Sequence, residues 1–212
     1  FPVYSSEFFS QYSAYQKGII HKNTEQLLLQ QEGKWSLLSS LLPMSIAKRL
    51  MDDDNKLIAH TYKDVTVMFT DIKGFTNFSR SITPMELVKF LNNMYSAFDD
   101  VLMDWDAYKV EILGDAYFVV CGCPDEKSPT ENAARATEVA LILQSLMPSL
   151  TGNSGIMMRV GLHSGSVVAG VVGRKDPRFH LFGHTVLFAN KMESHGMPGK
   201  VHASEATFKR LK

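Results

Sequence analysis

Two aspartates occupy positions from which their side chains could hold a metal ion together. Asp71 follows the apolar run Val65–Phe69, which predicts a buried strand, and the chain turns at Gly74. Such a turn places backbone N–H groups beside a carboxylate, and the two together can hold a triphosphate and its Mg²⁺. Asp115 lies in a second turn, between two further predicted strands. Taken singly, each aspartate also fits a cap or turn residue.

The predicted elements bring these two turns to one edge of a sheet. Strands and helices follow the βαββαβ order of the ferredoxin-like α+β sandwich. In that sheet the end of the first strand lies beside the turn of the following hairpin, so the two carboxylates can converge. Two hard oxygen ligands on adjacent strands suit a phosphoryl-transfer site with two Mg²⁺ ions roughly 3.5–4 Å apart. The predicted elements are strands at 65–69, 108–113, 116–120, 157–162 and 167–172, with a turn at 163–165, and helices at 84–105, 128–146, 184–193 and 205–211.

The chain before residue 60 does not follow the alternating pattern. Residues 1–22 are rich in aromatic side chains, show no period and are left unassigned. From Thr24 onward apolar residues recur at helical spacing, with a break expected at Pro43. This helical segment, 23–55, is either an amphipathic helix packed on its own domain or a connector that dimerises and relays a signal.

Composition and charge argue against several classes of protein. The 212 residues include 22 basic and 22 acidic side chains, and this zero net charge argues against a nucleic-acid binder that works through bulk charge. Cys121 and Cys123 are separated by a single residue and we expect no disulfide between them, and free thiols fit a reducing compartment. No apolar run approaches the roughly 18–20 residues of a membrane span. We expect a cytoplasmic chain, or the cytosolic domain of a membrane protein.

Four segments carry a resemblance to a known family. They read VMFTDIKGFT, KVEILGDAYFVV, MRVGLHSGSVVAGVVG and LFGHTVLFANKMES, and they resemble in order and spacing the class III nucleotidyl cyclases, the adenylyl and guanylyl cyclases of eukaryotes. The resemblance implies a catalytic domain over 60–212, truncated at its C-terminus. It also implies the reaction, in which the 3′-hydroxyl of a nucleoside triphosphate attacks its own α-phosphate and releases pyrophosphate, with two Mg²⁺ or Mn²⁺ ions.

The resemblance extends to individual site residues. Asp71 and Asp115 match the metal ligands of the family, with the carbonyl of Ile72 as a third ligand. The positions that match nucleotide-binding residues are Gly74, Phe75 and Thr76 in the phosphate-binding turn, Leu113 and Gly114 in the hairpin, and Arg159, which matches an arginine that contacts the phosphates.

Two positions depart from the family pattern. Complete sites have an asparagine that orients the ribose and an arginine that stabilises charge on the α-phosphate, but this chain has Leu187 and Lys191 there. Leucine has no hydrogen-bonding group, and lysine lacks the planar fork of arginine. Losing one such stabiliser costs roughly 3–4 kcal/mol. Because the family builds its site at a dimer interface, the pattern resembles the metal-bearing half of a heterodimer, such as the alpha subunit of soluble guanylyl cyclase, and implies a partner domain with the asparagine and arginine.

Two further positions concern the choice of nucleotide. Glu111 lies where guanylyl cyclases carry a glutamate and adenylyl cyclases a lysine, and His180 replaces the usual cysteine or aspartate. In a heterodimer the partner supplies the base pocket of the working site, so Glu111 indicates the purine only by kinship, and it is otherwise a solvated strand residue. The resemblance therefore favours GTP over ATP, with cyclic GMP as the product.

Several functions stay open at this point. The first is a catalytic half-site, and the second is a regulatory pseudo-cyclase that binds nucleotide or only dimerises. A third is a homodimer of low activity that uses Lys191 in place of arginine, and an adenylyl cyclase half is a further alternative. The last is an RNA-binding module, but that needs exposed aromatic residues in a basic strand motif, which VEILG and FVVCG lack. The resemblance also implies an upstream sensor, which the sequence does not name.

Overall fold

The structure, a computed structural model, describes residues 28–39, 41–52, 57–152, 154–173 and 176–212. The chain divides into two compact units, Phe1–Lys56 and Leu57–Lys212. The unassigned segment 1–22 of the sequence prediction lies outside the described residues, and so do residues 23–27, 40 and 53–55 of the predicted connector.

The described residues of the first unit form two helices that are separated at Pro43. Residues 28–39 are helical, and α2 spans Met44–Asp52. Proline has no N–H with which to continue a helix, and the Pro43 carbonyl instead accepts from the N–H groups of Ile46 and Ala47, each at 2.9 Å. The predicted break is confirmed, whereas the dimerising role of 23–55 stays a prediction.

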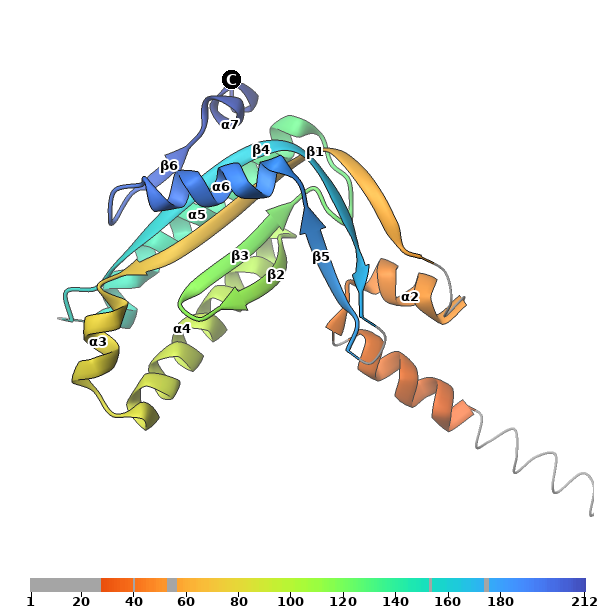
Figure 1. Ribbon diagram of the computed structural model, residues 1–212, viewed down its shortest axis with the longest axis horizontal. Coiled ribbons are helices and arrows are strands. Elements are labelled where there is room, and N and C mark those ends of the chain that lie inside the picture. Colours follow the sequence, from red (N-terminus) through yellow and green to blue (C-terminus); the bar gives the residue numbers. More distant parts are fainter. Residues whose placement is uncertain (1–27, 40, 53–56, 153, 174–175) are drawn as a thin grey trace, which may run out of the picture. The chain divides into compact units, whose positions relative to one another are not determined.

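The second unit is built on one sheet. The strands follow one another across it in the order β2-β3-β1-β4-β5, and β6 pairs in parallel with β4 (Figure 1). The pairings of β1 with β3, of β1 with β4 and of β2 with β3 are antiparallel, which confirms the ferredoxin-like βαββαβ sandwich. The strands are β1 Ala59–Lys73, β2 Tyr108–Leu113, β3 Ala116–Cys121, β4 Met157–Val172, β5 Arg178–Phe182 and β6 Val201–Ala203.

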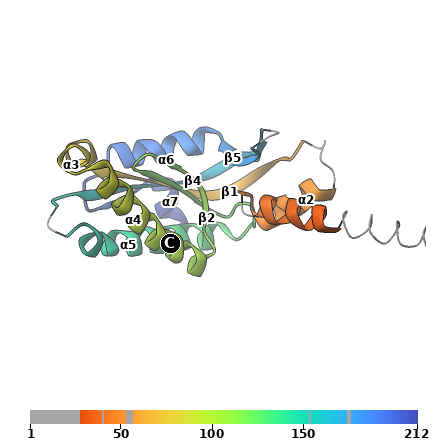
Figure 2. The same cartoon turned by 90° about the horizontal axis from the view of Figure 1, so that it is seen from below.

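Helices cover both faces of this sheet. The helices α4 and α5 lie on one face and α6 lies on the other (Figure 2). A capping box opens α4, because the Glu86 N–H donates to Thr83 Oγ1 and the Thr83 N–H donates to the Glu86 carboxylate. Ser128 caps α5, and both helix starts were predicted. The helices are α3 Phe75–Ser81, α4 Pro84–Trp105, α5 Pro129–Thr151, α6 His184–Ser194 and α7 Glu205–Arg210.

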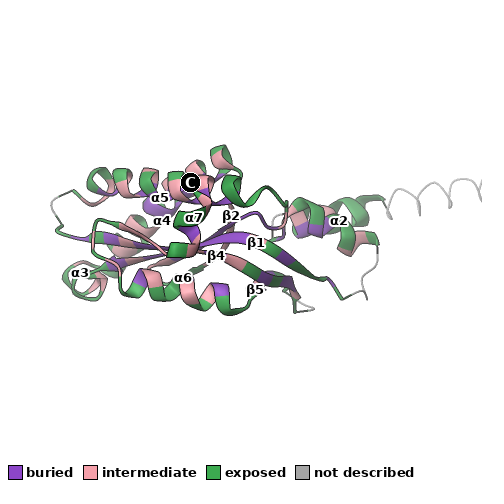
Figure 3. Cartoon of the chain, turned by 90° about the horizontal axis from the view of Figure 1, so that it is seen from above, coloured by how far each residue is buried: buried purple, intermediate pink, exposed green. Residues whose placement is uncertain are grey.

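The main core lies between the sheet and helices α4 and α5 (Figure 3). Tyr117 and Phe98 are among its largest fully buried side chains. Cys121 belongs to this core, Cys123 is buried beyond the end of β3, and both are free thiols, as predicted. Within the part of the chain that the structure describes, no helix combines the length and apolar character needed to cross a membrane.

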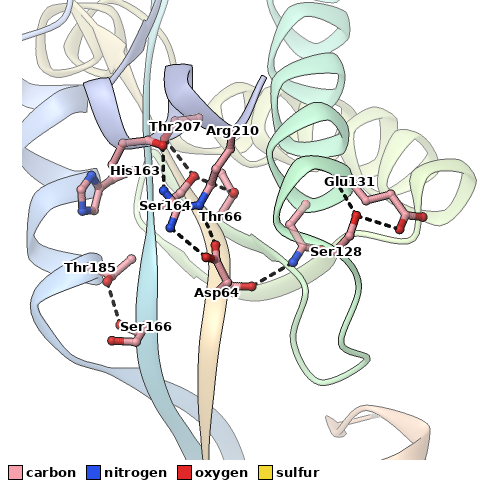
Figure 4. Close-up of polar contacts among 12 residues, drawn as sticks. Asp64, Thr66, Ser128, Glu131, His163, Ser164, Ser166, Thr185, Thr207 and Arg210 are labelled. Carbon is pink, nitrogen blue, oxygen red and sulfur yellow. Dashed lines mark hydrogen bonds and ion pairs between the residues drawn. The ribbon is translucent and has the colours of Figure 1, made fainter. Parts of the chain in front are cut away.

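One prediction about the strands was wrong. The two strands expected on either side of a turn at 163–165 form the single strand β4. The polar side chains that suggested a turn have buried partners, because Ser164 Oγ lies 2.8 Å from Thr66 Oγ1 and donates to Thr207 Oγ1 at 3.0 Å (Figure 4). A hydroxyl group with hydrogen-bond partners can be buried at little cost, so the strand continues through it.

A bidentate ion pair anchors α7 to the sheet. Arg210 donates from Nε and Nη2 to the two carboxylate oxygens of Asp64, at 2.7 and 2.8 Å (Figure 4). The Asp64 carbonyl also accepts from the side-chain amide of Asn132 on α5, at 2.9 Å. The C-terminal helix predicted from Glu205 is therefore confirmed, and its last turn is tied to β1.

Three elements were not predicted from the sequence. The short helix α3 begins directly after Gly74, where the sequence indicated only a turn. The strand β6 has three residues, too few for an alternation of apolar and polar side chains to be recognised, whereas the alternation in β5, RFHLF, was present in the sequence but was not used.

Candidate active site

Asp71 and Asp115 come together where β1 ends beside the β2–β3 turn. The register pairs Thr70 with Tyr117, so the next residues of β1 lie next to this turn. The backbone of Ile72 hydrogen-bonds to the Asp115 carboxylate. Gly114 adopts φ +66°, a left-handed conformation that glycine accepts without strain in a tight turn. The geometry therefore brings the two carboxylates together as the fold order predicted.

The electrostatics of this pair are unfavourable while both carboxylates are charged. Burial raises the pKa of Asp115, and the neighbouring charge of Asp71 raises it further. Backbone hydrogen bonds and the charge of Arg159 lower the same pKa, but the net direction is upward. The site therefore carries negative charge that a bound cation would stabilise.

Arg159 lies across from Asp71 in the β1–β4 register and contacts two carboxylates. Its Nη2 donates to the Asp71 carboxylate, and its Nε lies 2.9 Å from Glu193 Oε1 on α6. The Arg159 and Glu193 side chains are 20% and 9% exposed, so this ion pair is largely withdrawn from water. The sequence predicted that Arg159 contacts phosphates, whereas here its guanidinium is held between Asp71 and Glu193.

Glu193 received no role in the sequence interpretation. Burial and the charge of Asp71 raise the pKa of Glu193, and Arg159 lowers it without reversing the shift. Thr185, Ala189 and Glu193 recur every four residues and form the buried stripe of α6. A buried carboxylate on such a stripe needs a charged or hydrogen-bonding partner. The four-residue spacing was therefore the signal in the sequence that could have identified Glu193 as a residue of the site.

The segment predicted to be a phosphate-binding turn, Gly74–Thr76, is a turn only at Gly74 and is helical after it. Gly74 adopts φ +88° at the N-cap of α3, and Phe75 and Thr76 form the first turn of that helix. A pocket of about 340 Å³ lies here, with Gly74, Lys73 and Asn77 among the residues that line it. The positions expected to bind phosphate thus follow Asp71 directly, on a short helix instead of an open loop.

The two departures from the family pattern lie on the exposed face of α6. Leu187 is 63% exposed, and Lys191, one turn later, places its Nζ 5.5 Å from the centroid of the Phe188 ring. Both line a pocket of about 370 Å³, whose described lining includes neither Asp71 nor Asp115. The structure therefore groups the two degenerate positions together and apart from the aspartate pair.

The two residues predicted to contact the base also lie close to each other. Glu111 Oε2 on β2 lies 4.0 Å from His180 Nδ1 on β5. These strands are at opposite ends of the strand order, but the rings of Tyr108 and Phe179 also approach, with centroids 5.8 Å apart. The sheet therefore curls until its two edges meet. Leu113, at the end of β2, is half-exposed next to the hairpin turn.

The residues present fit a divalent metal that is shared with a phosphate substrate. Mg²⁺ is commonly held by one or two carboxylates together with substrate phosphates, and the Asp71–Asp115 pair supplies that number. Among the described residues, no group of three or more His, Cys, Asp or Glu side chains could hold a metal ion. Mg²⁺ prefers six oxygen ligands, so two carboxylates leave positions for substrate oxygens, waters and backbone carbonyl groups.

Comparison with known proteins decides the family. A family model described as the adenylate and guanylate cyclase catalytic domain matches residues 57–212. The chain belongs to this family. This cyclase domain is 40% identical over 200 residues to the receptor-type guanylate cyclase gcy-28 of Caenorhabditis elegans, across 93% of the chain and 16% of the relative. It is 40% identical over 194 residues to the guanylate cyclase soluble subunit beta-2 of Rattus norvegicus, across 89% of the chain and 28% of the relative.

Solved structures support the same assignment. The guanylate cyclase domain of RhGC from Catenaria anguillulae, in complex with GTP, superposes with a TM-score of 0.68 at 37% identity, across 72% of this chain and 84% of that one. The catalytic core of a rhodopsin-guanylyl cyclase with converted specificity, in complex with ATPαS, gives the same TM-score and identity across 73% and 84%. The predicted family and fold are confirmed, and the chain spans a small part of the curated relatives' length.

Proposed function

We propose that this cyclase domain is the metal-bearing half of a dimeric nucleotidyl cyclase that converts GTP to cyclic GMP and pyrophosphate. The observation that carries the proposal is the distribution of residues between two places. Asp71 and Asp115 converge beside Arg159, while Leu187 and Lys191 stand where a complete site needs asparagine and arginine. A chain that has one set and lacks the other requires a partner domain that supplies the missing set.

The proposed chemistry assigns a role to each residue of the aspartate cluster. The 3′-hydroxyl gives its proton to water and its oxygen bonds to the α-phosphorus, while the bond from that phosphorus to the bridging oxygen breaks and pyrophosphate leaves with both bonding electrons. Asp71 and Asp115, with the Ile72 carbonyl, would hold two Mg²⁺ or Mn²⁺ ions, which supply Lewis-acid activation and neutralise charge when bound. Arg159 would exchange Asp71 for the triphosphate, whose phosphates would also lie against Gly74–Thr76.

GTP is favoured over ATP for two reasons. Glu111 keeps the carboxylate that guanylyl cyclases carry at this position, with His180 beside it, and because the partner supplies the base pocket of the working site, Glu111 supports GTP only by kinship. The relatives compared above are named guanylate cyclases, and one solved relative is a complex with GTP. Because another solved relative has converted specificity and holds ATPαS, ATP is retained as the alternative substrate.

The proposal also covers the cellular compartment of the domain and the kind of protein that contains it. We infer that the domain acts in the cytoplasm, in a longer protein whose upstream sensor is connected through the helical segment 23–55. The support is that the chain spans 16% and 28% of the lengths of two relatives, one of which is named a receptor-type cyclase.

A complementation assay tests the proposal. The chain is assayed alone, and then mixed with a cyclase domain that has the asparagine and arginine but lacks both metal aspartates, with GTP or ATP and Mn²⁺. We expect cyclic GMP only in the mixture, and we expect Asp71→Ala to abolish it. Asp100→Ala, which removes an exposed carboxylate from α4, is the matched control and should keep full activity.

Each alternative has its own outcome in this assay. Turnover by the chain alone would contradict the half-site proposal and make Lys191 a working substitute for arginine. Cyclic AMP from the mixture would reassign the substrate. No product from two chains shown to associate by analytical ultracentrifugation would favour a regulatory pseudo-cyclase.

A further inference from the structure

Tyr95 reaches the aspartate cluster from the helix beneath the sheet. Its side chain extends from α4 and the residue is only 8% exposed. The Tyr95 hydroxyl donates a hydrogen bond to the carbonyl oxygen of Gly114, at 2.9 Å. Gly114 directly precedes Asp115, so this bond connects a core helix to the turn that carries one of the two aspartates.

The Tyr95 ring is held firmly by its neighbours. It stacks on Tyr117, with centroids 5.5 Å apart and an interplanar angle of 15°, and it meets the edge of Phe98 at 6.2 Å and 78°. Both neighbours are buried in the main core. The position of the hydroxyl is therefore fixed by packing that does not involve the turn.

Apart from the hydrogen bond between the Ile72 backbone and the Asp115 carboxylate, the turn has little support from outside its own hairpin. Gly114 and Leu113 are exposed, and β2 lies at an end of the strand order, paired only with β3 among the described strands. The pairing of β2 with β3 is also irregular between Lys109 and Glu111. A turn at the end of an irregular edge strand can pivot, and a contact from a rigid helix restricts that motion.

Tyr117 provides an internal comparison. It belongs to the same stack and is fully buried, but its hydroxyl donates to the Asp99 carboxylate. Asp99 also receives Lys109 Nζ at 2.6 Å. One tyrosine hydroxyl of the stack thus supports the body of the hairpin, and the other supports the turn beside Asp115.

We propose that Tyr95 is a positioning residue for the metal site, which acts by holding the Gly114–Asp115 turn so that the Asp115 carboxylate faces Asp71. The proposal rests on the proposed function. The charges of Asp115 and Asp71 contribute, after burial, to a raised pKa of the Tyr95 hydroxyl, which is consistent with a short separation between these groups. Tyr95→Phe would keep the stacked ring and remove only the tether.

The test compares Tyr95→Phe with Tyr117→Phe, since each variant removes one buried hydroxyl from the same stack. Amide hydrogen exchange over residues 108–117 of the full chain is measured first. We expect exchange at the hairpin end to be about three- to tenfold faster in Tyr95→Phe, the factor that corresponds to one lost neutral hydrogen bond. In the complementation assay, the Mn²⁺ concentration for half-maximal activity should rise by a similar factor, with kcat at saturating Mn²⁺ within about twofold of the unmodified chain.

The control variant should behave differently. Tyr117→Phe should lower the urea midpoint at least as much as Tyr95→Phe does, yet leave the Mn²⁺ requirement unchanged. Unchanged exchange at the hairpin end in Tyr95→Phe, or an equal rise in the Mn²⁺ requirement in both variants, would overturn the proposal. If no mixture makes cyclic nucleotide, the proposed function fails, and faster exchange in Tyr95→Phe alone would still show that Tyr95 holds the turn.

Discussion

Glu193→Gln should leave the domain as stable as before, or slightly more stable, although it removes the charge of one partner in a buried ion pair. Burial and the charge of Asp71 raise the pKa of Glu193 more than Arg159 lowers it. A carboxyl group whose pKa is raised on folding is less favourable in its ionised form in the folded chain than in the unfolded chain. Its charge therefore reduces stability at any pH above the folded pKa.

The magnitude follows from the charges around Arg159. The three carboxylates of Asp71, Asp115 and Glu193 surround one guanidinium, and the substitution removes one negative charge from this group. Breaking a well-compensated buried ion pair costs about 3–5 kcal/mol. Here Arg159 keeps its hydrogen bond to Asp71, and the glutamine keeps an oxygen atom beside Arg159 Nε. We expect the free energy of unfolding to stay within about 1 kcal/mol of the unmodified value, with a gain as the expected sign.

Urea unfolding at pH 7.5 of the unmodified chain, Glu193→Gln and Glu193→Ala tests this reasoning. The alanine variant removes the carboxylate that lies 2.9 Å from Arg159 Nε and puts no polar group in its place beside the buried guanidinium, so it should lose about 1–3 kcal/mol. As the pH falls through the raised pKa of Glu193, the Glu193 carboxylate of the unmodified chain becomes protonated and neutral. Any stability advantage of Glu193→Gln should then disappear. A loss of 3 kcal/mol or more in Glu193→Gln would refute the argument, because it would mean that the charged pair stabilises the fold.

Three further predictions follow from the same structure. Leu187→Asn combined with Lys191→Arg should give the chain alone roughly a hundredfold more cyclase activity than the unmodified chain alone, and no gain would mean that the α6 face lacks more than these two groups. Gly161→Ala would place its Cβ 2.0 Å from a backbone nitrogen of α6, so urea unfolding should show a loss of about 1–3 kcal/mol, and an unchanged midpoint would contradict this packing. Burial and the charge of Arg210 lower the pKa of His163 from 6.5, so the unfolded chain takes up that proton first as the pH falls. The free energy of unfolding should therefore drop more steeply between pH 7 and 5 in the unmodified chain than in His163→Gln, and equal slopes would exclude His163 as the cause.

The sequence by itself determined the main helices, the first three strands and the place of the two aspartates. The capping box at Thr83 and the cap at Ser128 are local hydrogen-bond patterns, so the sequence predicts them without any knowledge of the tertiary fold. The apolar run before Asp71 and the tight turn before Asp115 are equally local. Once the βαββαβ order was known, the sheet geometry required these two turns to be neighbours, and the structure places them so.

Only the tertiary structure decided which partners the polar side chains have. Ser164 continues β4 because Thr66 and Thr207 satisfy its hydroxyl, and these partners are 98 and 43 residues away in the chain. Arg159 contacts Glu193 because α6 lies on β4, and Tyr95 supports the aspartate turn because α4 packs beneath the hairpin. Local patterns fix dihedral angles and caps, whereas the burial and charge of a side chain depend on the surface that folds onto it.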